Sequence, residues 1–191
     1  MNKEVLHKTI KCVEECGFSE WNSIVELANK KEEIKNVWFA KVKSQLIKYF
    51  NNNLSENWEH KDCKVWYLKG NTESSLGIWF EEFHIISLWA SNGFYDNQKA
   101  KDLLQKKEFA IISDKFERID KRFDGDYKLR EYGNFKFDTA IDGHYDSDTI
   151  SFFAGVETEK FCKQIIEKIE RFTNNSEITE LFKQINELTK K

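Results

Sequence analysis

The residues that could carry chemistry gather in one short stretch, DGHYDSDT. His144, Asp146 and Asp148 stand there at alternate positions, and a second segment, FEEFHII, offers Glu81 or Glu82. If the stretch is extended, its three side chains share one face of a strand, where an imidazole and carboxylates can ligate one divalent cation. One hypothesis is therefore a metal-dependent hydrolase that uses Mg²⁺ or Mn²⁺ and a bound water to cleave phosphodiester-type substrates.

The same stretch is also typical of a polar turn before a buried strand. Asp and Ser favour turns because their side chains form hydrogen bonds with the nearby backbone, and Gly favours them because it adopts positive φ without strain. The apolar run that follows, Thr149–Ala154, predicts a short buried strand that Gly155 ends. If this strand starts only at Thr149, the alternation of Asp146 and Asp148 carries no meaning and the hydrolase hypothesis loses its main support.

Other motifs that carry chemistry are absent from the sequence. It contains no Gly-rich phosphate loop, no H-E-x-x-H and no G-x-S-x-G. Cys12 and Cys16 are four residues apart, but no second close pair of Cys or His completes a zinc site with them, and Cys63 and Cys162 are scattered. We therefore expect no cofactor unless the metal hypothesis holds.

The composition bears on the partners, the compartment and the source of the chain. The net charge is −3, with 30 basic and 33 acidic residues interspersed, so nucleic-acid binding is not indicated. The start of the chain lacks the apolar run of a secretion signal, and no window of 18 apolar residues predicts a membrane span. Four scattered cysteines then favour reduced thiols in a cytoplasm. The absence of proline and the abundance of Lys, Asn, Ile and Phe are typical of a low-GC bacterium or its phage.

The apolar spacing predicts helices over residues 1–53. Gly17 is expected to end a first helix, and the S-x-x-E pattern of Ser23 and Glu26 predicts that a second one begins at Ser23. A strong helical pattern follows and is expected to end in the asparagine run 51–53.

Residues 63–156 are expected to be mainly β. Aromatic and β-branched runs there predict antiparallel strands, with Gly70–Ser75 as a hairpin loop. One helix is expected near 96–107, capped by Asp96, and a further short strand at 109–113.

Residues 157–190 predict two antiparallel helices joined by a short turn, with Asn174 or Ser176 capping the second. The second helix carries an apolar stripe that could pair two copies of the chain or pack on its own domain; it includes Ile178, Leu181, Ile185 and Leu188.

Together these elements predict a single α+β domain over 1–191, with an antiparallel sheet between N-terminal helices and a C-terminal helix pair. The lack of a complete motif and the surplus of aromatic residues favour a non-enzymatic cytoplasmic protein that docks on another protein, as a regulator or a phage-encoded inhibitor. The metal-dependent hydrolase remains the alternative.

Overall fold

A computed structural model describes residues 17–81, 85–116, 128–129, 132–133 and 147–191. The chain divides into two compact units, Met1–Val37 and Trp38–Lys191. Within the described residues, no helix is both long enough and apolar enough to cross a bilayer.

The N-terminal helical part is dominated by one long helix, α2, at Phe18–Asn53. It ends in the asparagine run, as expected, but the prediction that a helix begins at Ser23 is wrong. The Ser23 hydroxyl donates to the carbonyl of Ser19, 3.1 Å away, so it lies inside the helix and caps nothing. The start instead falls next to Gly17, whose N–H donates to the Glu20 carboxylate.

A four-stranded antiparallel sheet follows α2, with the strands in sequence order. Its strands are β1 (Trp58–Lys61), β2 (Val65–Leu68), β3 (Gly77–Glu81) and β4 (Ile85–Trp89). The hairpin loop expected at Gly70–Ser75 does connect two antiparallel strands. β1 was not expected, because three of its four residues, Glu, His and Lys, are polar.

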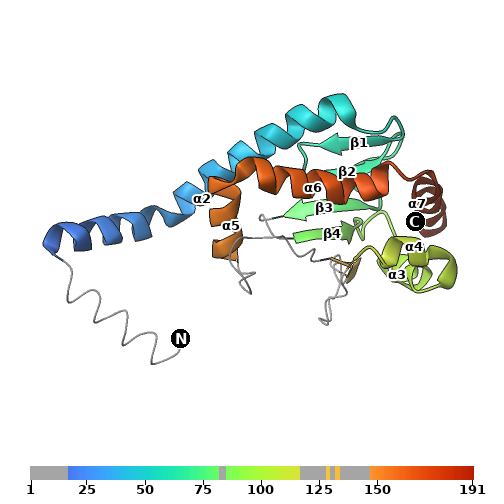
Figure 1. Ribbon diagram of the computed structural model, residues 1–191. Coiled ribbons are helices and arrows are strands. Elements are labelled where there is room, and N and C mark those ends of the chain that lie inside the picture. Colours follow the sequence, from blue (N-terminus) through green and yellow to red (C-terminus); the bar gives the residue numbers. More distant parts are fainter. Residues whose placement is uncertain (1–16, 82–84, 117–127, 130–131, 134–146) are drawn as a thin grey trace. The chain divides into compact units, whose positions relative to one another are not determined.

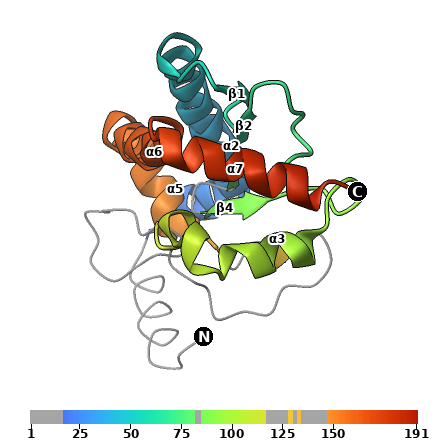
Figure 2. The ribbon, with the colours of Figure 1, turned by 90° about the vertical axis from the view of Figure 1, so that its right-hand side faces the viewer.

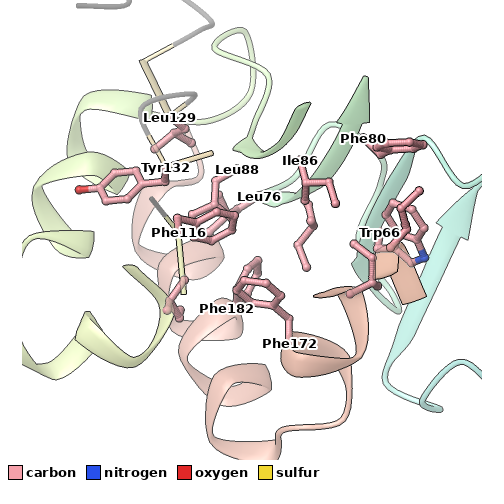
Figure 3. Close-up of a cluster of buried hydrophobic side chains, with 14 of the residues drawn as sticks. Trp66, Leu76, Phe80, Ile86, Leu88, Phe116, Leu129, Tyr132, Phe172 and Phe182 are labelled. Carbon is pink, nitrogen blue, oxygen red and sulfur yellow. The ribbon is translucent and has the colours of Figure 1, made fainter. Parts of the chain in front are cut away.

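One face of the sheet forms the core together with α2 and the C-terminal helices. Trp66, Ile78 and Leu88 are adjacent across β2, β3 and β4 and are fully buried. Figure 3 shows Phe172 and Phe182 meeting this face from the helices. On the opposite face, Trp79 and Trp89 are half-buried and their ring centroids lie 4.4 Å apart. The aromatic residues therefore supply much of the core as well as a pair outside it.

Helix α3, at Asn97–Leu104, confirms the helix expected near 96–107. The Asp96 side chain caps it by accepting from the N–H of Lys99 at 3.0 Å. The strand expected at 109–113 is wrong, because the chain forms a 3₁₀ turn, η1 (Lys107–Phe109), and then α4 (Ala110–Ser113). Phe109 and Ile112 are buried while Ile111 is only half-buried, which is helical and not alternating burial.

The strand expected at Thr149–Ala154 is also wrong, because Ser147–Val156 is a helix, α5. Ile150, Phe153 and Ala154 are buried whereas Phe152 is half exposed, the spacing of a helical face. Every strand of the described residues lies between Trp58 and Trp89. Among the described residues of 63–156 the strands therefore end at Trp89, and the sheet begins before this range, at Trp58.

Two further helices complete the chain, α6 (Thr158–Thr173) and α7 (Ser176–Thr189). The short connection was expected, but the cap is Asn175, whose side chain accepts from the N–H of Ile178 at 3.1 Å. Figures 1 and 2 show α7 running across the end of α6. A long helix, a central antiparallel sheet and C-terminal helices confirm the α+β class.

The apolar stripe of α7 packs into the core of its own chain. Ile178 and Ile185 are fully buried, Leu181 is half-buried, and only Leu188 is substantially exposed. Two of the four residues considered for pairing two copies are thus already covered.

Candidate functional site

The predicted metal ligands fall in different parts of the chain. Asp148 lies in the first turn of α5 and is exposed, and Glu81 is the last residue of β3. His144, Asp146 and Glu82 lie outside the described residues. The strand geometry that was to align Asp148 with its neighbours is replaced by a helix, and the metal site itself stays a prediction.

No alternative metal centre takes its place in the part of the chain that the structure describes. No three His, Cys, Asp or Glu side chains there converge in a way that could hold an ion.

A groove lies between the C-terminal half of α2 and α6. Its α2 wall is formed by residues three or four apart, which are Gln45, Lys48, Tyr49, Asn52 and Asn53. This spacing is one stripe of a helix, next to the stripe of Val42, Leu46 and Phe50 that enters the core.

The α6 wall is a second stripe with the same spacing: Glu159, Cys162, Lys163, Ile166, Glu167 and Glu170. Two contacts tie the walls together. The Cys162 thiol lies 3.8 Å from the Val42 carbonyl oxygen, and the Tyr49 hydroxyl donates to the Glu170 carboxylate at 2.6 Å. Because both residue numbers increase between these contacts, the two helices run in the same direction along the groove.

The floor of the groove is apolar and its rim is polar. Its volume is about 680 Å³, and the Tyr49 ring and Ile166 are half-buried there. The hydrogen bond from Tyr49 to Glu170, followed by burial and the carboxylate charge, raises the pKa of the Tyr49 hydroxyl. Tyr49 therefore keeps its proton and acts as a fixed donor that holds Glu170 at the rim.

The charges of the rim are unequal. Glu159, Glu167 and Glu170 stand on α6, whereas the basic side chains are Lys48 and Lys163, the latter 4.0 Å from Glu167. The groove therefore combines an apolar floor with a slight excess of negative charge.

Sequence reasoning missed this groove because neither wall is conspicuous alone. The α2 wall is a mostly polar stripe beside the core stripe, and Tyr49 is its one large ring. The groove exists only once α2 and α6, separated by about a hundred residues, lie side by side. Comparisons of the chain with protein-family models, with curated proteins and with solved structures found no match.

Proposed function

We propose that this chain is a protein-binding module whose docking surface is the α2–α6 groove. The observation that supports the proposal is the pairing of two helical stripes over an apolar floor with a polar rim. A trough between two helices running in one direction accepts a third helix, because the ridges of one helix pack into the grooves of its neighbours. Helix-in-groove docking is a recurring mode of peptide recognition.

The chemistry of the groove specifies the occupant as an amphipathic helix of another protein. Its apolar residues, spaced by three and four, would cover Ile166 and the Tyr49 ring. Lys or Arg beside that stripe would face Glu159 and Glu167, which are exposed. Charges at such a rim favour the orientation and the rate of docking more than the affinity.

Lys, Asn, Ile and Phe, which have AT-rich codons, are abundant in the chain, and proline is absent. This residue usage supports a low-GC bacterium or its phage as the source. We extend the proposal to a cytoplasmic regulator that inhibits its partner by occupying a helix which the partner needs elsewhere. Loss of the partner's activity on binding, measured with the purified pair, is the result expected of an inhibitor, and unchanged activity would leave binding without inhibition.

Photo-crosslinking tests the docking surface and its occupant together. Benzoylphenylalanine replaces Lys163 at the rim or, as control, Arg171, an exposed residue of α6 that does not line the groove. We expect one dominant protein crosslink from position 163 and none from position 171. The crosslinked peptide should be a helix with an apolar stripe and flanking basic residues.

A synthetic peptide of the crosslinked segment then measures the contribution of the floor. Ile166→Glu should weaken its binding at least tenfold, since a charge would face apolar surface. Leu188→Glu places the same charge on an exposed apolar residue of α7 outside the groove and should leave binding unchanged. Glu167→Lys, on the exposed rim, tests the charge preference if Ile166→Glu lowers the melting temperature. A crosslink to an extended or acidic segment, or unchanged affinity in both groove variants, would overturn the proposal.

A further inference from the structure

The turn between β1 and β2 places a cysteine in a backbone conformation that is unusual for it. The N–H of Lys64 donates to the carbonyl of Lys61 at 3.0 Å, and the two central residues, Asp62 and Cys63, have φ of 56° and 51°. Residues 62–64 connect the paired residues Lys61 and Val65. A turn with two central residues at positive φ normally carries Asn-Gly, because residues with a side chain are strained there. The strain is stored at a residue that could do chemistry.

The imidazole of His60 lies between this cysteine and an amide. Its Nδ1 is 3.7 Å from the Cys63 sulfur and 3.4 Å from the Cys63 backbone nitrogen. Its Nε2 is 3.1 Å from the Oδ1 of Asn51, at the end of α2. Since a carbonyl oxygen only accepts, Nε2 carries the ring hydrogen, which leaves the lone pair of Nδ1 directed at Cys63. The N–H of Cys63, which donates to Nδ1, requires the same tautomer.

Thiol, imidazole and amide thus stand in the order in which cysteine hydrolases arrange their nucleophile, base and orienting group. In such an array the imidazole takes the proton of the thiol, and the amide holds the ring in the tautomer that can do so. All three residues lie within a short segment. Asn51 is near the end of α2, His60 is on β1, which follows, and Cys63 is in the turn after β1, where its sulfur lies near the His60 ring.

The resting state of this array is neutral. Cys63 is almost fully buried, and burial raises the pKa of its thiol to about 12, against the opposing charge of Lys43. Burial also lowers the pKa of His60, against the opposing charge of Asp62. A thiolate is therefore scarce near pH 7, and attack on an electrophile needs a base at the moment of reaction.

The turn that carries Cys63 lies at the edge of the sheet. β1 is an edge strand of four residues, and Lys61, Asp62 and Lys64 of the turn are exposed. Short edge segments open at a lower free-energy cost than the core. Opening also relieves the positive φ of Asp62 and Cys63.

We propose that Cys63 is a nucleophilic thiol for soft carbon electrophiles, with His60 as its base and Asn51 as the residue that positions His60. With the probe iodoacetamide, a bond forms between the Cys63 sulfur and the methylene carbon while the carbon–iodine bond breaks. Iodide leaves with the bonding electron pair, and the thiol proton moves to Nδ1 of His60. This activity goes beyond the docking function and does not depend on the α2–α6 groove being occupied.

The chain contains a matched control in Cys162. Its thiol is also buried, with 4% exposed against 2% for Cys63, and burial raises its pKa to about 12 as well. Its partner, however, is the Val42 carbonyl oxygen, which cannot take a proton. The two thiols therefore match in burial and in the direction of their pKa shift, but they differ in the base and in their place in the fold, since Cys63 lies in an edge turn and Cys162 within α6. The His60 variant is needed to separate the two differences.

The test measures alkylation of Cys63 and Cys162 by iodoacetamide in the native full chain, with Cys12→Ser and Cys16→Ser to remove the other thiols. We expect Cys63 to react at least ten times faster than Cys162 at pH 7, since a positioned base contributes about a hundredfold or more. Its rate should level off above the lowered pKa of His60, and therefore already below about pH 6.5, whereas the Cys162 rate should rise about tenfold per pH unit.

Two variants separate a base from a structural support. If His60 is the base, His60→Gln slows Cys63 at least tenfold, and Asn51→Ala shifts the pH at which its rate levels off. If His60 only holds the turn closed, His60→Gln speeds the labelling of Cys63. That result, equal rates for the two thiols, or a tenfold rise per pH unit for Cys63 would each overturn the proposal.

Discussion

At the scale of single residues, Gly155 shows how one hydrogen atom decides a packing contact. A Cβ at this position would overlap the Trp38 ring, so α5 can approach α2 only because the residue is glycine. The Gly155 carbonyl also accepts from the Thr158 hydroxyl at 3.1 Å, which joins α5 to α6. The glycine that seemed to end a strand instead sits at the point of closest approach of two helices.

Gly155→Ala is therefore expected to destabilise the protein. The overlap should cost about 1–3 kcal/mol, and alanine normally gains about 1 kcal/mol within a helix, so the net loss should reach up to about 2 kcal/mol. Gly93→Ala is the control, because the nearest atom to its added Cβ is 3.7 Å away. Urea unfolding measures both. Equal stability of the two variants would show that the Trp38 ring moves aside without cost.

His60 should make stability depend on pH in one direction. Its pKa is lowered in the folded protein by burial, so the unfolded chain binds the proton more strongly. The stabilisation is fully present above the unfolded pKa of about 6.5 and is lost as the pH falls through the folded value.

The comparison with His60→Gln isolates this effect. The difference in free energy of unfolding between the native protein and the variant should shrink between pH 7.5 and pH 5, while the contributions of other groups largely cancel. Denaturant unfolding at several pH values provides the measurement. A difference that stays constant with pH would mean that the ring does not change its protonation on unfolding.

At the scale of the elements, capping explains why α3 was predicted correctly. Asp96 accepts from the N–H of Lys99 and satisfies a donor that the first turn of the helix leaves open. Asp96→Ala should reduce the free energy of unfolding by about 0.5–2 kcal/mol, whereas Asp96→Asn retains the acceptor and should cost little. Thermal unfolding of the two variants tests the cap. Equal losses would assign the effect to the charge and not to the hydrogen bond.

The elements that could be predicted from the sequence carry a clear period or a local signal. α6 and α7 have buried residues at spacings of three and four, and the Gly70–Ser75 loop separates two apolar runs. The run TISFFA is mostly apolar and only six residues long, and short apolar runs do not distinguish a strand from a helix. β1 was missed for the opposite reason, since its polar residues show no apolar run at all.

The sites depend on contacts that no local pattern contains. The groove needs α2 and α6 side by side, and the Cys63 array needs a turn at positive φ that a search for metal-ligand spacing does not consider. Cys63 was visible in the sequence as one of four scattered cysteines. The helix end at Asn51 was predicted, but the edge strand β1, which places His60 between Asn51 and Cys63, was not.

At the scale of the whole molecule, metal binding separates the docking function from the hydrolase alternative. A ligand that binds only the folded state raises its melting temperature. As a protein-binding module, the chain should melt at the same temperature with and without Mg²⁺ or Mn²⁺, as followed by calorimetry. A rise that Asp146→Ala abolishes would instead support the hydrolase and its ligands His144, Asp146, Asp148 and Glu81.

The last helix, α7, contacts the sheet through both hydrogen bonds and ring packing. The Trp58 indole donates to the Thr179 hydroxyl at 3.1 Å and packs on the Phe182 ring, with centroids 5.1 Å apart. The buried N–H of Leu76 donates to the Asn186 side chain at 2.8 Å. α7 is thus a part of the core and not an appendage to it.

A chain that ends at Asn174 should therefore fail to fold, and not merely fail to pair with a second copy. Removing α7 exposes the surfaces that Ile178, Phe182 and Ile185 now bury completely, and each such side chain contributes about 1.5–3 kcal/mol. Their sum approaches the whole stability of a typical domain, about 5–15 kcal/mol. We expect the shortened chain to lose its near-ultraviolet circular dichroism and its cooperative unfolding, while Leu188→Glu in the full chain keeps both. A shortened chain that unfolds cooperatively as a monomer, beside a full-length chain that light scattering finds as a dimer, would instead assign the stripe of α7 to pairing between copies.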